Sequence, residues 1–199
     1  MSFEPDLSLW EAWGPAEAAQ RLSDVATPWY VTAGWALDLF RGRQTRDHED
    51  LEIAVPDHGF DAVREALAEF ELFVIGGGFA HPLTSEALAT HHQTWVREPT
   101  TGKWRLDVMR EPWDGDTWVC RRDRRIRLPS SSVIAHTEDG IPYAQPEVAL
   151  LFKAKAARPK DEDDFAAVLP LLDPARRRWL AEALALVHPR HSWLRSLSG

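Results

Sequence analysis

Hydrophobic and polar residues alternate with a period of two between Asp50 and Val55. Leu51 and Ile53 are apolar and alternate with Asp50 and Glu52. Successive side chains of a β-strand point to opposite faces of its sheet. The pattern therefore predicts a strand with one face in the core and two carboxylates on the other face.

A helical period follows directly. Phe60, Val63 and Leu67 recur at spacings of three and four residues, which predicts a helix over residues 60–70. Shorter helices are predicted over 15–25 and 35–40, and strands over 29–32 and 72–75. Two hairpins are predicted, one from strands 94–97 and 103–109 and one from 117–122 and 125–128.

The pattern changes to helix alone from Pro146 onward, with helices predicted over 146–157, 160–172 and 174–187. We therefore predict two domains, a catalytic domain over 1–145 and a helical region over 146–199. The fold class is α/β (α+β), with a mixed sheet flanked by helices and a small C-terminal helical region.

Composition narrows the class of protein. Of the chain's 199 residues, 44% are hydrophobic and 27% are charged, which is typical of a globular protein with a sizeable core. No apolar run is long enough for a membrane helix, and the acidic N-terminus does not resemble a targeting segment. Cys120, the single cysteine, excludes an internal disulfide and a cysteine-based zinc site. We expect a cytoplasmic protein that does not bind membranes.

The formal net charge of −8 argues against a dedicated nucleic-acid-binding surface and suits a cationic partner or metal ions. Most of the tryptophans are expected to pack in the core, with a few left to stack on a base or a sugar.

The carboxylates of Asp50 and Glu52 are the first candidates for chemistry. Two like charges on one face of an apolar strand repel each other and resist burial, and a divalent cation such as Mg²⁺ would compensate them. A solvent-exposed strand face is the alternative. Asp107, between Leu106 and Val108 in another predicted strand, is a third carboxylate of the same kind.

Several motifs occur in an order known from one enzyme superfamily. They are Ala33-Gly34-Trp35-Ala36-Leu37-Asp38, Thr45-Arg46-Asp47-His48-Glu49-Asp50-Leu51-Glu52, Leu106-Asp107-Val108, Pro146-Glu147, Leu150-Leu151-Phe152-Lys153-Ala154-Lys155 and Lys160-Asp161-Glu162-Asp163-Asp164-Phe165. The chain resembles the DNA polymerase β-like nucleotidyltransferase superfamily, and more narrowly the aminoglycoside 2''-O-nucleotidyltransferase family. The resemblance spans about residues 28–172. Two positions depart from the family pattern, because Ala33 replaces a usual glycine and Glu52 replaces a frequent aspartate.

The resemblance implies two-metal nucleotidyl transfer from an NTP, with ATP as the expected donor, to a hydroxyl of a small molecule. Asp50 and Glu52 would hold Mg²⁺ against the triphosphate, and Asp107 would hold a second Mg²⁺ near the attacking hydroxyl. Asp107 would also accept the hydroxyl proton, and pyrophosphate would leave.

Residues for nucleotide binding follow from the same resemblance. The helix that opens at Gly34 and Trp35 offers free backbone N–H groups to a phosphate, although Gly34 also suits a tight turn. Arg46 would reach a phosphate, and His48 would pair with a carboxylate or orient the loop. Lys153 and Lys155 cannot share one helix face, because residues two apart point in different directions, so at most one would reach the triphosphate and the other would be solvated. The resemblance favours Lys155.

Two further residues have alternative roles. Asp38 would cap or orient the loop after its helix instead of binding metal. Asp161, with Lys160, would either begin a solvated helix or help to shape the nucleotide pocket.

Three functions stay open from the sequence. The first is modification of a small, cationic acceptor such as an aminoglycoside-like antibiotic. The second is modification of tRNA or a protein, for which the arginines of 121–125 would have to form a basic strip. The third is a catalytically silent nucleotide- or ligand-binding domain. The sequence leaves the oligomeric state open between monomer and homodimer.

Overall fold

The computed structural model describes residues 1–198 and packs as two compact units. The first unit comprises Met1–Val31 and Arg46–Trp113. The second comprises Thr32–Thr45 and the chain from Asp114 on. This grouping follows proximity in space, whereas the boundary predicted at residue 145 followed composition and stays a prediction.

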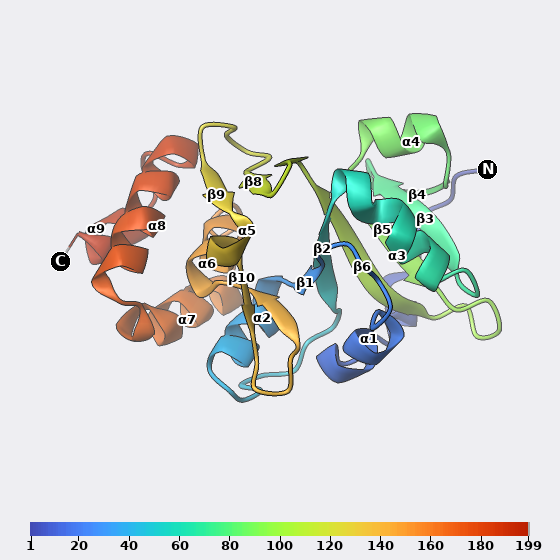
Figure 1. Ribbon diagram of the computed structural model, residues 1–199, viewed down its shortest axis with the longest axis horizontal. Coiled ribbons are helices and arrows are strands. Elements are labelled where there is room, and N and C mark those ends of the chain that lie inside the picture. Colours follow the sequence, from blue (N-terminus) through green and yellow to red (C-terminus); the bar gives the residue numbers. More distant parts are fainter. Residues whose placement is uncertain (199) are drawn as a thin grey trace. The chain divides into compact units, whose positions relative to one another are not determined.

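The first unit is built on a mixed sheet. Its strands run in the order β1 (Tyr30–Val31), β2 (Glu52–Pro56), β6 (Trp104–Glu111), β5 (Gln93–Arg97), β3 (Glu71–Gly76) and β4 (Phe79–Pro82). Neighbours are antiparallel except β2 and β6, which are parallel. The helices are α1 (Pro15–Arg21), α3 (Phe60–Ala66) and α4 (Ser85–Thr90), with 3₁₀ turns η1 (Leu7–Leu9) and η2 (Asp57–Gly59) (Figure 1).

Apolar side chains of β2 and α3 form the core that the periodicities predict. Leu51, Ile53 and Val55 are completely buried, and Phe60 and Val63 of α3 are buried as well. The predicted alternation along β2 is therefore confirmed on its apolar side.

Tryptophans join the N-terminal segment to the sheet. The ring centroid of Trp95 lies 5.0 Å from that of Trp10 and 5.3 Å from that of Trp104, in edge-to-face arrangements. The backbone N–H groups of Glu11 and Trp13 donate to carbonyl groups of β6. Aromatic pairs of this geometry stabilise a core beyond their buried area. In this unit, these tryptophans pack against one another, as expected for core residues.

The second unit consists mainly of helices. They are α2 (Ala33–Phe40), α5 (Ser130–Val133), α6 (Pro146–Lys153), α7 (Pro159–Val168), η3 (Leu169–Leu171), α8 (Pro174–Val187) and α9 (Trp193–Leu197). Helix α6 packs against α2, α7 and α8, and α8 packs against α9 (Figure 1). Two antiparallel hairpins complete the unit, β8 (Thr117–Val119) with β9 (Arg127–Pro129) and β10 (Ile134–His136) with β11 (Pro142–Ala144). Strand β7 (Trp113–Asp114) lies where the chain passes between units.

The mixed α/β class is confirmed, as are both predicted hairpins and the three helices after residue 146. Several predicted helices are too long, because α1 ends at Arg21, α3 at Ala66 and α6 at Lys153. The prediction missed β4, α4, β7, α5, β10, β11 and α9. None of the described helices is both long and apolar enough to cross a membrane.

Ala33, where the family usually has glycine, begins α2 with a φ of 54°. This is the left-handed region, which costs an L-residue roughly 1–2 kcal/mol and costs glycine little. The departure noted in the sequence therefore carries a backbone strain at the start of the helix.

We expect the substitution Ala33→Gly to raise the free energy of unfolding by about 0.5–1 kcal/mol, since the relieved strain exceeds the extra freedom of glycine in the unfolded chain. Urea unfolding of the two proteins measures the difference. Ala36→Gly, in the same helix, is the matched control and should lower stability by about 1 kcal/mol or more. Equal losses in both variants would show that Ala33 is not strained.

Candidate functional site

The register of β2 and β6 brings two of the predicted carboxylates side by side. Glu52 is the direct partner of Asp107 in the parallel pairing, and Ile53 is the partner of Val108. Partner residues of neighbouring strands point to the same face, at a strand spacing of about 4.8 Å. Asp50 lies two residues before the start of β2, outside the strand that the sequence predicted to begin there, and its charge still acts on Asp107. Two of the three predicted carboxylates thus share one face of the sheet, and the third lies in the segment that leads into it.

Asp107 occupies the least favourable position for a charge. Its side chain is 2% exposed. The Gln93 amide donates to its Oδ2 at 2.5 Å, whereas its Oδ1 is buried without a hydrogen-bond partner. Burial raises the pKa of Asp107 well above its usual range, and the charge of Glu52 raises it further. The hydrogen bond from Gln93 lowers this pKa, and Asp50 adds a smaller increase.

Strand β5 lies beside β6 and contributes the side chains next to Asp107. Trp95 is the antiparallel partner of Asp107, and Gln93 is the partner of Met109, so both lie on the carboxylate face. Sequence reasoning identified neither Gln93 nor Trp95. The alternation of buried Thr94 and Val96 with Gln93 and Trp95 was the available signal, but it does not reveal the register with β6.

The donor set fits a divalent cation. Carboxylate oxygens are the ligands that Mg²⁺ prefers, and Mg²⁺ takes the rest of its shell from water and substrate phosphates. The buried, unpartnered Oδ1 of Asp107 is an oxygen that a cation would satisfy. Among residues 1–198, no group of three or more His, Cys, Asp or Glu side chains is arranged to hold a metal ion. Glu52 and Asp107, which are paired across the two strands, therefore offer two ligands, and a bound ion would take the rest of its shell from water and phosphate oxygens.

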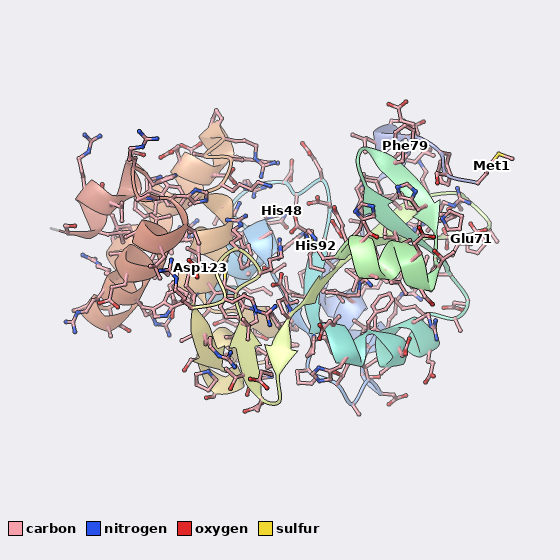
Figure 2. All side chains as sticks on the ribbon, turned by 90° about the horizontal axis from the view of Figure 1, so that it is seen from above. Met1, His48, Glu71, Phe79, His92 and Asp123 are labelled. Atoms are coloured by element: carbon pink, nitrogen blue, oxygen red, sulfur yellow. The ribbon has the colours of Figure 1, made fainter. Side chains whose placement is uncertain are left out.

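The residues predicted to bind nucleotide are divided between the units. Arg46 and His48 lie in the first unit, in the connector before β2; His48 is labelled in Figure 2. One guanidinium nitrogen of Arg46 donates to the carbonyl of Asp47 at 3.1 Å. Gly34 and Trp35 lie in the first turn of α2, in the second unit. Thr32, the residue that precedes α2, makes no side-chain hydrogen bond to its first turn.

Asp38 orients the loop after its helix, which was one of its predicted roles. It is 3% exposed and accepts hydrogen bonds from the backbone N–H and the hydroxyl of Thr45, at 3.0 and 2.5 Å. It therefore fixes the end of the connector that leads toward Arg46.

Lys153 and Lys155 lie in different surroundings, and the prediction that the lysine not bound to the triphosphate is solvated is wrong for Lys153. Lys153 is buried and ion-paired with Asp161 and Asp164, at 2.9 and 2.8 Å. Lys155 is exposed, two residues beyond the end of the helix. Lys155 is therefore the lysine that is accessible to a ligand.

Comparison with known proteins gives matches of two kinds. The family model described as aminoglycoside-2''-adenylyltransferase matches residues 16–81, which include Gly34, Asp50 and Glu52. No curated protein matches the sequence significantly.

Solved structures show the same fold over most of the chain. A solution structure of the antibiotic-resistance factor ANT(2'')-Ia has a TM-score of 0.57 at 12% identity, covering 96% of this chain and 95% of that one. A crystal structure of ANT(2'')-Ia with adenylyl-2''-tobramycin has a TM-score of 0.58 at 13% identity, covering 86% and 95%. The lincomycin-bound lincosamide adenylyltransferase LnuA has a TM-score of 0.53 at 15% identity, covering 76% and 91%. The predicted fold and the family resemblance are confirmed.

We expect Asp107→Asn to stabilise the protein at neutral pH when divalent cations are chelated. Because the folded-state pKa is raised, Asp107 favours the folded state at low pH, and this contribution is lost as the pH rises toward the raised pKa. Removing the charge should therefore add on the order of 1–3 kcal/mol at neutral pH and much less near pH 4. Urea unfolding at several pH values measures this difference.

Asp24→Asn, an exposed carboxylate of the same unit, is the control and should leave stability nearly unchanged. A loss of stability in Asp107→Asn at neutral pH would contradict the assignment of a buried, uncompensated charge.

Proposed function

We propose that this chain, which resembles the aminoglycoside nucleotidyltransferases in sequence over residues 16–81 and in fold over most of its length, is a nucleotidyltransferase. It transfers a nucleoside monophosphate, AMP in the first instance, from an NTP to a hydroxyl of a small molecule. The reaction depends on magnesium and takes place in the cytoplasm, where NTPs are available.

The carboxylates of Glu52 and Asp107, side by side on β2 and β6 with Asp50 just before β2, are the observation that carries this proposal. Asp107 keeps a buried oxygen without a partner beside the charge of Glu52. A protein that used this face only for stability would gain by replacing one of these groups with a neutral residue. Retention of all three is explained by binding of cations during the reaction.

Each carboxylate has a distinct role in the proposal. Asp50 and Glu52 would hold one Mg²⁺ for the triphosphate, and Asp107 would hold a second for the acceptor. When bound, the ions would supply charge neutralisation for the transfer.

Asp107 also accepts the proton of the acceptor hydroxyl, a role supported by its raised affinity for a proton. The oxygen then bonds to the α-phosphorus as the bond to the bridging oxygen breaks, and pyrophosphate leaves.

Nucleotide binding is assigned to Gly34, Trp35, Arg46, His48 and Lys155 on the resemblance. The backbone N–H groups at the start of α2 suit a phosphate, because Thr32 does not cap them with its side chain. The exposed Lys155 suits a polyphosphate as a mobile cation.

The acceptor is proposed to be a cationic, hydroxyl-bearing molecule of the aminoglycoside type. The net charge of −8 would favour the approach of such a molecule. The structural relatives are an aminoglycoside-modifying and a lincosamide-modifying adenylyltransferase, so a small hydroxylated antibiotic is the class to test first.

A macromolecular acceptor is disfavoured by the arginines of 121–125. Arg122 donates to two backbone carbonyls of α6, and Arg125 pairs with Asp123 at 2.6 Å. Arg122 and Arg125 are thus engaged within the protein, which leaves less of the run for the basic strip that an RNA ligand would need.

We expect Asp50→Asn, Glu52→Gln and Asp107→Asn each to reduce nucleotidyl transfer by at least about 100-fold, because each removes charge that the transition state requires. Pyrophosphate release with Mg²⁺, each NTP and a panel of aminoglycosides and lincosamides measures the reaction. Asp61→Asn, an exposed carboxylate of α3, is the matched control.

Transfer that needs an acceptor and all three carboxylates would support the proposal and name the substrate class. Binding of Mg²⁺ and NTP without transfer to any small molecule would redirect the search to macromolecular acceptors. Neither binding nor transfer by the unmodified protein would exclude the enzyme function.

A further inference from the structure

The segment that carries Lys155 is tethered at both of its ends. It runs from Ala154 to Arg158, between the last residue of α6 and the first residue of α7. We name it the Lys155 turn. Ala157 in this turn has a φ of 43°, in the left-handed region. A short segment with such a residue keeps its conformation only if the surrounding contacts impose it.

A buried ion-pair cluster fixes the side of the turn that faces α7. Lys153, 5% exposed, donates to Asp161 and Asp164, whose side chains are 0% and 8% exposed. Asp161 also accepts hydrogen bonds from the backbone N–H and the guanidinium of Arg158, at 3.1 and 2.9 Å. One carboxylate therefore holds the residues on either side of Lys155.

The electrostatics of Asp161 agree with this role. Burial opposes its ionisation, but hydrogen bonds from Arg158 and Lys153 outweigh burial and lower the pKa of Asp161 to about 2. The carboxylate is therefore charged throughout the physiological pH range. Removing one member of such a cluster leaves the others buried without compensation.

An arginine holds the other side of the turn. The guanidinium of Arg122 donates to the carbonyls of Leu151 and Phe152, at 2.9 and 2.8 Å. Its carbon atom lies 4.6 Å from the ring centroid of Phe152, and that of Arg121 lies 4.5 Å from it. A cation at the C-terminus of a helix satisfies its last carbonyls and its dipole. Arg122 comes from the loop between β8 and β9 and is followed in the chain by Asp123, which is labelled in Figure 2.

Several positively charged side chains lie around the Lys155 turn. Their charge acts on His188: burial lowers the pKa of His188, and the charges of Arg122, His191 and Lys155 lower it further. The Nε2 atom of His188 is buried without a hydrogen-bond partner. A cationic surrounding of this kind favours an anionic ligand.

We propose that Arg122 and Asp161 are positioning residues, which hold the Lys155 turn so that the ammonium group of Lys155 is presented to the triphosphate of the NTP. The inference rests on the proposed function and deepens it, because it assigns a role to the arginine run and to the acidic start of α7. Lys153, Arg158 and Arg122 are used within the protein, and Lys155 is the cation of this turn left for the nucleotide.

The proposal predicts that Lys155 and Arg122 act as a unit. We expect Lys155→Ala to weaken binding of ATP with Mg²⁺ about 10- to 100-fold, as for loss of a charged hydrogen bond. Arg122→Ala should weaken it by a similar factor, although Arg122 does not contact the nucleotide. In the double variant the loss should not exceed that of Lys155→Ala alone. Isothermal titration with ATP and Mg²⁺, without acceptor, measures the dissociation constants.

Matched variants separate positioning from general damage to the fold. Arg124→Ala removes an exposed arginine of the same loop, and Asp163→Asn neutralises an exposed carboxylate of α7. Both should bind ATP as the unmodified protein does. If Arg122→Ala does not fold, Arg122→Lys and Asp161→Asn replace it. Each is then measured alone and combined with Lys155→Ala. Thermal unfolding confirms that the compared proteins are folded.

Losses that multiply in the double variant would overturn the proposal, because Arg122 would then act independently of Lys155. Unchanged ATP binding in Lys155→Ala would overturn it as well, while transfer by the unmodified protein would leave the proposed function in place. If the unmodified protein neither binds ATP with Mg²⁺ nor transfers a nucleotide, the proposed function fails and this proposal fails with it.

Discussion

The parallel pairing of β2 and β6 is the constraint on which the site depends. It sets Glu52 beside Asp107 and, through the same register, sets Ile53 beside Val108 in the core. A slip of one residue would move the apolar side chains to the wrong face, so the core fixes the register. The free energy of apolar burial therefore forces like charges together, and they cannot separate without disrupting the sheet.

In the second unit, unlike in the first, the buried charge of Lys153 is compensated by charges of opposite sign. Lys153 is nearly as buried as Asp107, yet it has two carboxylates within 3 Å. Asp107 has two neighbouring carboxylates and one amide donor. Buried charges are normally compensated, so a compensated cluster is explained by the fold alone. An uncompensated one needs a ligand, and this contrast distinguishes the proposed reaction centre from the positioning cluster.

The site could be predicted from the sequence as far as local periodicity reaches. The alternation through Asp50 and Glu52 and the position of Asp107 between apolar residues identified the carboxylate face. Spacing indicated that Lys153 and Lys155 cannot face the same ligand, and the family resemblance favoured Lys155. Gln93 and Trp95 escaped prediction because their role depends on the register of β5 with β6, which the pattern within β5 does not contain. The family resemblance added the reaction, which no periodicity indicates.

The fold was predictable in the same measure. Long periodic segments were identified, whereas β10 and β11 span only three residues each, too few for a period to appear. The division into units could not be predicted for a different reason. Thr32–Thr45 belongs to the same unit as the chain from Asp114 on, and composition along the chain carries no information on contacts between such distant segments.

Backbone strain supports the same assignment of function. Among residues 1–198, the non-glycine residues with left-handed φ are Ala33 and Ala157. Ala33 precedes Gly34, and Ala157 belongs to the turn that carries Lys155. Each conformation costs roughly 1–2 kcal/mol, and nothing in the helical pattern of either segment requires it. Strain of this kind persists where the surrounding structure imposes it, and it is concentrated at ligand-binding sites. Ala33 and Ala157 adjoin two of the positions that the proposed function assigns to the nucleotide. In that proposal, their strain serves the shape of the two binding segments and not the stability of the adjoining helices.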